Sequence, residues 1–77
     1  MKYLIEKTKN TEHINRMICI DNIMMLHQRF NDCSSITYFN ENDTVELPMT
    51  IRQFYTLCSN SKQVLETRYH LYSVVEL

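Results

Sequence analysis

The sequence predicts a small α+β domain, made of an antiparallel sheet of about five strands, one helix packed on one face of the sheet at about residues 50–59, and an added C-terminal strand. Three observations predict this fold. Short segments rich in β-branched and aromatic residues alternate with Asn and Asp clusters, as strands bounded by turns do. A helix-start signature follows Pro48. The 77 residues contain no linker-like tract, so we treat 1–77 as a single domain.

The strand candidates follow one another along the first two thirds of the chain. The first three are "KYLIEKT", "NRMICI" and "IMMLHQ", and a hairpin of "SSITYF" and "TVEL" joined by "NEND" comes next. The chain has no glycine, so any turn that needs a positive φ must use Asn or Asp. The residues available for this are Asn10, Asp21, Asn22, Asn31, Asp32, Asn40, Asn42, Asp43 and Asn60.

The helix is predicted from its first turn. Pro48 ends the fifth strand, and "TIRQ" is a capping box in which Thr50 and Gln53 each satisfy a free backbone amide. Met49 and Phe54 occupy the positions of a hydrophobic staple. The residues expected on the packed face of the helix, at spacings of three and four, are Ile51, Phe54, Tyr55 and Cys58.

Residues 62–77 have an ambiguous pattern. Every second residue from Leu65 to Leu77 alternates as in a strand, while Leu65, Tyr69 and Tyr72 would also line a helix. Their aromatic and β-branched content favours the strand. We therefore expect a sheet-plus-helix core in residues 1–58 and a C-terminal extension in residues 62–77.

The apolar residues exceed what one short helix can cover. In "MICI" and "IMML" both faces of the strand are apolar, so the C-terminal segment or a second protomer must cover the second face. In so short a chain we expect self-association. The residues predicted to make partner or oligomer contacts are Met24, Leu26, Tyr69, Leu71, Tyr72 and Val75.

Composition excludes several classes of function. The net charge is −1 and the basic residues are scattered, so we expect no specific nucleic-acid binding. There is no apolar run near the ~18 residues of a membrane span and no signal-peptide pattern. The three cysteines have wide spacings, and we interpret them as small buried apolar residues, which suits a reducing compartment. We therefore expect a cytoplasmic protein, and the missing apolar run indicates that it makes no membrane contact.

Catalytic and cofactor signatures do not occur in the sequence. Without glycine, the phosphate loop, the dinucleotide fingerprint and the nucleophile elbow all lose their usual motif. The histidines His13, His27 and His70 and the cysteines Cys19, Cys33 and Cys58 have no metal-ligand spacing. The carboxylates Glu41, Asp43 and Glu46 surround a hairpin tip that we expect to be exposed. Solvent exposure accounts for acidic residues there without a catalytic role. We therefore expect no enzyme activity, no metal and no cofactor.

Three pieces of the chain occur in a familiar order within residues 3–58: "ICI-DN-IMML", the hairpin "SITYFNENDTVEL" and the capped helix "TIRQFYTLC". Over this span the chain resembles the small flagellar and swarming proteins of the FlbD/SwrD type and their uncharacterised relatives. Asn42-Asp43 replace the hairpin glycine of that family, and Met49-Thr50 replace its Glu-Ser. The resemblance implies a small β-rich adaptor and assigns no catalytic residue.

The sequence thus predicts a small non-enzymatic protein-interaction module or adaptor that acts through its sheet edge and apolar face. Its expected partners are a second copy of the chain, as a dimer or larger oligomer, and another protein. The alternative is an inhibitor encoded by a phage or mobile element, which would block an effector protein of a host defence system or sequester a nucleotide signal. Aromatic residues could stack on a nucleotide, but only Arg52 and Arg68 are cations near them.

Overall fold

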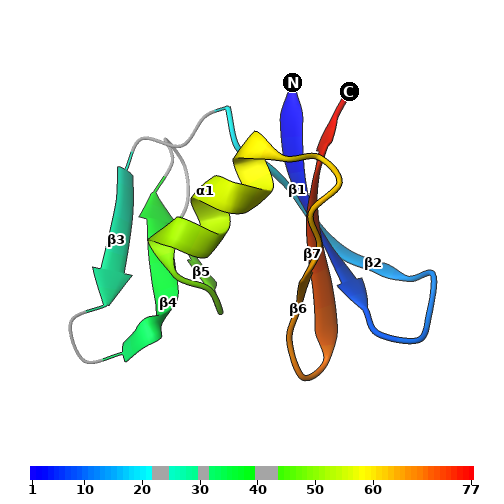
Figure 1. Cartoon of the computed structure of the whole chain (residues 1–77), viewed down its shortest axis with the longest axis horizontal. Coiled ribbons are helices and arrows are strands. Elements are labelled where there is room, and N and C mark those ends of the chain that lie inside the picture. The colour runs from blue at the N-terminus through cyan, green and yellow to red at the C-terminus, as the bar shows by residue number, and fades with distance from the viewer. Residues whose placement is uncertain (22–24, 30–31, 40–43) are drawn as a thin grey trace.

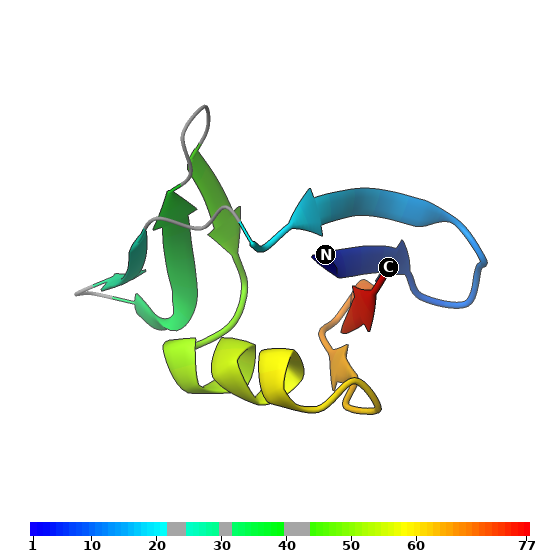
Figure 2. The ribbon, with the colours of Figure 1, turned by 90° about the horizontal axis from the view of Figure 1, so that it is seen from above.

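The computed structural model describes residues 1–21, 25–29, 32–39 and 44–77. In chain order, its elements are β1 (Lys2–Thr8), β2 (Ile14–Cys19), β3 (Met25–Arg29), β4 (Asp32–Phe39), β5 (Thr44–Leu47), α1 (Ile51–Ser59), β6 (Leu65–Glu66) and β7 (His70–Glu76). The strands form two antiparallel sheets, and α1 runs from one to the other (Figures 1 and 2). The protein is a small α+β fold, as the sequence predicts.

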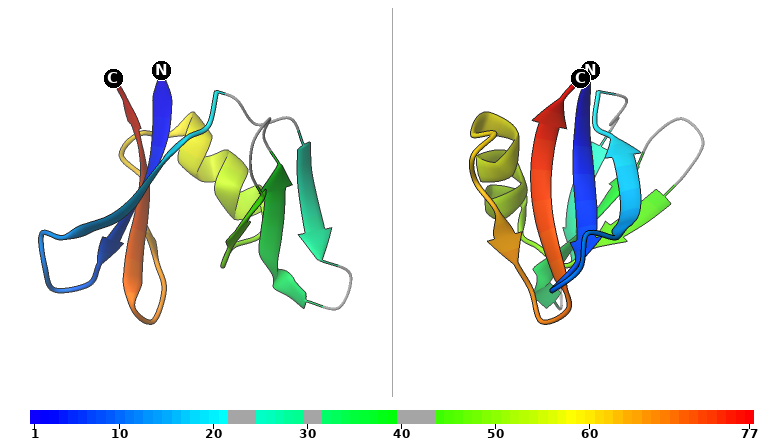
Figure 3. Two further views of the ribbon diagram at one scale, coloured as in Figure 1. Left: turned by 180° about the vertical axis from the view of Figure 1, so that it is seen from behind. Right: turned by 90° about the vertical axis from the view of Figure 1, so that its right-hand side faces the viewer.

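The larger sheet has the strand order β2-β1-β7-β6. β1 pairs with β2 on one side and with β7 on the other, over its whole length from Lys2 opposite Glu76 to Thr8 opposite His70. Figure 3 shows β1 and β7 side by side in the middle of this sheet. The turn from β1 to β2 places Asn10 at φ 64°, which confirms one of the Asn positions expected to replace glycine.

This order corrects the expected place of the C-terminal segment. Residues 62–77 were expected to extend a core formed by residues 1–58, but β7 is an interior strand and supplies Tyr72 and Val74 to the core. The segment also contains two strands, β6 and β7, where a single added strand was expected. Alternation identifies a strand but not its neighbours, because strand pairing depends on which edges remain open after the chain has folded.

The smaller sheet has the strand order β3-β4-β5. β4 and β5 pair antiparallel from Phe39 opposite Thr44 to Ile36 opposite Leu47, which confirms the predicted hairpin; its connector, residues 40–43, lies outside the described residues. The single five-stranded sheet expected from the sequence is thus divided in two. Within the described residues, β3, β4 and β5 pair with one another and not with the four strands of the larger sheet.

The core lies where α1 meets both sheets. α1 contacts β3 and β7, one strand from each sheet. The buried cluster comprises Leu4, Leu47, Met49, Phe54, Leu57, Tyr72 and Val74. Its members come from β1, β5, α1 and β7 and from the segment before the helix, so neither sheet has a separate core.

The buried face of α1 differs from the expected one. Phe54 and Leu57 are buried and Cys58 is half-buried, whereas Tyr55 is 71% exposed and Ile51 is 38% exposed. Both stripes have helical spacing in so short a helix. The positions of the two sheets select the buried stripe. The side of α1 that carries Leu57 packs in the core between the sheets, whereas the side that carries Tyr55 faces solvent.

The start of α1 confirms the predicted capping box. The amide of Gln53 donates to Oγ1 of Thr50 over 3.1 Å, and the amide of Thr50 donates to Oε1 of Gln53 over 2.8 Å. Met49, at the staple position, is fully buried beside Phe54 in the core cluster. The cap and the staple therefore hold the helix start against the sheets.

We expect Thr50→Ala to lower the free energy of unfolding by about 1 kcal/mol, because the Gln53 amide loses its acceptor. Urea melts monitored by circular dichroism measure this loss. Thr56→Ala is the matched control, since Thr56 is exposed and its Oγ1 donates within the helix to the carbonyl of Arg52. Equal losses in the two variants would contradict a capping role.

Candidate functional site

A polar cluster lies on the inner side of the four-stranded sheet, with Glu6 at its centre. Side chains alternate along a strand, so Glu6 points the same way as Leu4, into the protein. Only 3% of Glu6 is exposed. A buried carboxylate is costly unless it is paired and hydrogen-bonded, so its partners define the site.

A β-bulge brings two of these partners together. Glu6 lies opposite Arg16 and Lys7 opposite Ile14, so Asn15 has no residue of its own opposite it. A bulge places two successive residues against one residue of the neighbouring strand. As a result Asn15 and Arg16 both reach Glu6, which regular alternation would prevent.

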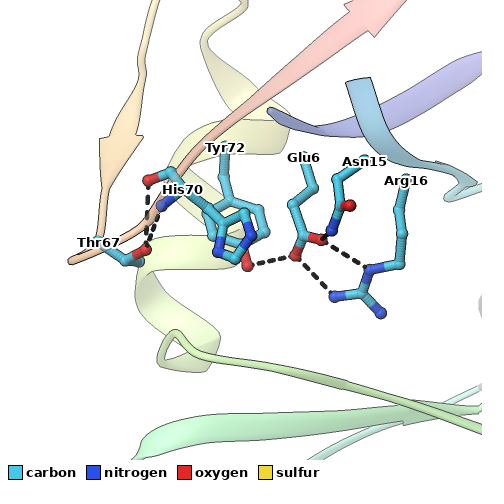
Figure 4. Close-up of polar contacts among 6 residues, drawn as sticks. All are labelled: Glu6, Asn15, Arg16, Thr67, His70 and Tyr72. Atoms are coloured by element: carbon cyan, nitrogen blue, oxygen red, sulfur yellow. Dashed lines mark hydrogen bonds and ion pairs between the residues drawn. The ribbon is translucent and has the colours of Figure 1, made fainter. Parts of the chain in front are cut away.

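The cluster ties three strands together (Figure 4). Nδ2 of Asn15 donates to Oε1 of Glu6 over 2.6 Å. Arg16 binds the carboxylate in a fork, with Nε 3.0 Å from Oε1 and Nη2 2.8 Å from Oε2. The hydroxyl of Tyr72 donates to Oε2 from β7. Glu6 on β1 thereby joins β2 and β7 inside the protein.

The pKa values of Glu6, Tyr72 and Arg16 are all shifted further from neutral pH. Burial raises the pKa of Glu6, but hydrogen bonds from Arg16, Tyr72 and Asn15 and the charge of Arg16 outweigh burial and lower the pKa from 4.5 to about 2. Burial and the bond to Glu6 raise the pKa of Tyr72, and the bond to Glu6 raises that of Arg16. Acid–base catalysis needs a pKa near the working pH. The cluster therefore suits a structural clamp better than proton transfer.

The neighbouring turn between β6 and β7 is closed by Thr67 and His70. Oγ1 of Thr67 donates to the carbonyl of His70 and accepts from its amide, both over 3.2 Å. The ring of His70 lies 6.2 Å from the ring of Tyr72 (Figure 4). His70 is half-buried beside this cluster, because it shares the inner side of β7 with Tyr72.

The opposite side of the four-stranded sheet carries a second surface, which we call the outer face. Because Leu4 and Glu6 point inward, the residues between and beside them point outward, and residues opposite each other in the register share a face. The outer face has three rows from β2 through β1 to β7: Cys19–Tyr3–Val75, Met17–Ile5–Ser73 and Ile14–Lys7–Leu71. In Figure 3 none of the described elements lies over it.

The outer face is mainly apolar. Ile5, at its centre, is only 6% exposed although it does not belong to the inner core cluster. Met17 and Ile14 on the edge strand β2 are 48% and 49% exposed. Lys7 is the one charged residue of the three rows, and its Nζ lies 3.9 Å from a carboxylate oxygen of Glu12. The fourth strand, β6, adds the exposed Glu66 opposite Leu71, so the apolar surface ends in a row that contains both Lys7 and Glu66.

Two of the six predicted contact residues lie on the outer face. Leu71 and Val75 are half-buried there, in the two end rows. Tyr69 lies in the bend before β7, where it is 62% exposed and the guanidinium carbon of Arg68 is 5.3 Å from its ring centre. Leu26 on β3 is half-buried against the core. Met24 lies outside the described residues.

For Tyr72 the predicted partner contact is wrong. It is 2% exposed and its hydroxyl binds Glu6, so it serves the interior rather than a partner surface. The sequence placed it correctly on the side of β7 opposite Leu71 but did not indicate which side faces inward. Sequence reasoning also missed Glu6, although a charged residue two positions after Leu4 in an apolar strand marks a buried charge in need of a partner.

Two shallow grooves lie beside α1. One has a volume of about 280 Å³ and is lined by Arg52, Gln53, Thr56, Leu57, Gln63 and Leu65. The other, about 240 Å³, lies between Cys58 and Lys2, whose Nζ donates to the carbonyl of Cys58 over 3.1 Å. Burial raises the pKa of the Cys58 thiol and the charge of Lys2 only partly opposes this. A thiol nucleophile needs a lowered pKa, so this groove shows no activated cysteine.

The remaining titratable residues are dispersed. His13, His27 and Glu46 are exposed, whereas Glu41 and Asp43 lie outside the described residues. Cys19 and Cys58, expected to be buried, are half-buried and form no disulfide; nothing is described of the Cys33 side chain. Within residues 1–21, 25–29, 32–39 and 44–77, no group of three or more His, Cys, Asp or Glu residues could hold a metal ion.

In the described part of the chain, no helix has both the length and the apolar character needed to cross a membrane. The described residues contain one helix, α1, which has nine residues. Comparison with protein-family models, with curated proteins and with solved structures gives no significant match to this chain.

Proposed function

We propose that this protein is a small non-enzymatic protein-interaction module that acts through the outer face and the edge strand β2 beside it, and that it self-associates. The outer face carries the proposal: its central residue is Ile5, its rim includes exposed Met17 and Ile14, and none of the described elements packs on it. Exposed apolar side chains that gather on one face of a protein often mark a binding surface.

The chemistry of the described residues supports binding rather than catalysis. The most buried polar group, Glu6, is fully engaged by Asn15, Arg16 and Tyr72, and its low pKa keeps it charged at neutral pH. No buried polar side-chain atom in the described part of the chain lacks a hydrogen-bond partner. A reducing compartment such as the cytoplasm suits Cys19 and Cys58, which are not joined in a disulfide.

A capture experiment tests the interaction role. Immobilised wild-type protein is exposed to a lysate of the native host, and retained proteins are identified by mass spectrometry. We expect Met17→Asp to lose the specific binders, because it places an unpaired charge in the apolar rim of the outer face. Since Met17 is 48% exposed, the variant should remain folded, which circular dichroism checks.

The matched control is Tyr55→Asp on the solvent side of α1, where Tyr55 is 71% exposed. It also replaces an exposed apolar side chain with a carboxylate, but on a different surface. We expect it to retain the binders of the wild type. If Met17→Asp and Tyr55→Asp capture the same proteins as the wild type, the outer face is not the interaction site.

A further inference from the structure

We propose that the larger groove beside α1, about 280 Å³ in volume, binds an extended, acidic peptide segment that adds to the edge of β6. This site goes beyond the proposed function, because it lies apart from the outer face. β6 is the last strand of the four-stranded sheet, and Figure 3 shows it at the rim of the sheet, on the side of α1.

The floor of the groove is apolar. Leu57 of α1 belongs to the buried core cluster, and the half-buried Leu65 of β6 packs against that cluster. Leu65 lies opposite Tyr72, which points inward, so Leu65 is on the inner side of the sheet and not on the outer face. The groove therefore offers two leucines to an apolar side chain of a ligand.

The rim of the groove is polar and positively charged. Arg52, Gln53 and Thr56 come from one side of α1, and Gln63 comes from the segment before β6. Among the described residues, Arg52 is the one charged residue that lines the groove, and it forms no ion pair with another of them. A guanidinium binds a carboxylate through two parallel hydrogen bonds. The charge of the rim therefore selects an acidic ligand.

The second groove beside α1 lacks this selection. Both Lys2 and Glu76 line it, so its charges oppose each other. Nζ of Lys2 already donates to the carbonyl of Cys58. The larger groove is therefore the better candidate for a charged ligand.

β6 supplies an open strand edge beside the larger groove. The amide of Thr67 donates to the carbonyl of His70 over 2.9 Å, so these two residues form a hydrogen-bonded pair. In an antiparallel ladder such pairs alternate with pairs that exchange no hydrogen bond. The next pair is Glu66 and Leu71, so the amide and carbonyl of Glu66 point away from β7. No other described strand pairs with that edge.

The open edge and the groove together fit an extended peptide. In strand addition, backbone hydrogen bonds at a sheet edge give affinity, and side-chain sites beside the edge give specificity. Side chains of an extended segment alternate, so an added strand turns every second side chain toward the inner side, where the groove lies. Because β6 has only two residues, few backbone hydrogen bonds form, and we expect weak, transient binding.

Peptide selection on the purified protein tests the charge preference. The probe is a phage-displayed library of random peptides of about seven residues, selected on the wild type and on Arg52→Glu. We expect the wild type to enrich peptides with alternating apolar residues and an Asp or Glu, and Arg52→Glu to enrich Lys or Arg in place of the acid. Arg52 is exposed, so the variant should remain folded, which circular dichroism checks.

Tyr55→Asp is the matched control, because it also adds a carboxylate to α1 but does not line the groove. It should enrich the same acidic peptides as the wild type. A selection that enriches no peptide on the wild type overturns the proposal, as does an unchanged charge preference on Arg52→Glu.

Substitutions of Glu66 test the strand addition, with the most enriched peptide as the probe in calorimetric titrations. Glu66→Pro removes the outward-pointing amide and keeps the ladder to β7, since proline is tolerated on an edge strand where its nitrogen faces solvent. We expect it to weaken binding about 10-fold, whereas Glu66→Ala, which keeps the amide, should bind like the wild type. Equal affinities of the two variants would contradict strand addition. If Glu66→Pro fails to fold, unchanged hydrogen exchange at the Glu66 amide of the wild type on peptide addition would contradict it instead.

Met17→Asp separates this site from the proposed function. Met17 lies on β2, at the opposite edge of the sheet from β6, so this variant should bind the selected peptide like the wild type. Loss of peptide binding in Met17→Asp would move the peptide site to the outer face and overturn the proposal. A failed peptide selection leaves the capture test of the outer face unaffected.

Discussion

Removing residues 62–77 is expected to abolish the fold. The deletion takes away β7, which pairs with β1 along its whole length, and it removes Tyr72 and Val74 from the core. It also removes the hydrogen bond that the Tyr72 hydroxyl donates to the Glu6 carboxylate. A domain of this size is only a few kcal/mol stable, so losing a central strand exceeds its margin. Loss of a cooperative urea transition and of near-ultraviolet circular dichroism measures this result.

A circular permutant provides the control for this truncation. The amino group of Met1 donates to the carbonyl oxygen of Leu77 over 2.8 Å, so a short linker can join the two ends. A permutant that starts at Lys62 and ends at Ser61 breaks the chain at the same place but keeps every strand. We expect it to melt cooperatively. A truncated chain that also melts cooperatively would restore residues 1–58 as an independent core.

Arg16→Met is expected to lower the free energy of unfolding by about 3 kcal/mol at pH 7. The guanidinium makes two of the hydrogen bonds to Glu6, and removing one partner of a buried pair leaves an undercompensated charge. Arg16 is 39% exposed at its side chain, which places the loss at the lower end of the range for buried pairs. Urea melts of both proteins at pH 7 measure it.

The loss should shrink in acid. In the folded protein the pKa of Glu6 lies at about 2, below its ordinary value of 4.5, so the carboxylate contributes its full stabilisation above pH 4.5 and loses it as the pH falls toward 2. A lowering of this size corresponds to about 3 kcal/mol. Arg16→Met removes most of that contribution, and the two proteins should therefore converge in stability near pH 2.

Lys9→Met is the matched control for the charge change. Lys9 Nζ lies 2.6 Å from a carboxylate oxygen of Glu66, which is 63% exposed at its side chain, and exposed ion pairs contribute about 0–1 kcal/mol. We expect a small loss for this variant. A deficit of Arg16→Met that stays the same at pH 7 and pH 2 would mean that Arg16 acts by packing its stem alone.

Part of the candidate site could be predicted from the sequence and part could not. Leu71 and Val75 were assigned to a contact surface because they alternate, and the structure places both on the outer face. Alternation puts Tyr72 on the face of β7 opposite Leu71 but does not say which face is the interior, so Tyr72 was assigned to the surface as well. The contact between Glu6 and Arg16 depends on the pairing of β1 with β2 and on the bulge at Asn15, and neither is local in the sequence.

The sequence specifies the local structure through patterns between near neighbours. It predicted the extent of β1, the hairpin of β4 and β5 and the capped start of α1, because period-two alternation, turn residues and a capping box act between near neighbours. Those patterns did not predict that the strands divide into two sheets, that β7 lies beside β1, or that α1 buries Leu57 rather than Tyr55. These choices depend on which strand edges and apolar stripes meet across the folded chain, and several pairings fit the same local pattern until packing selects one.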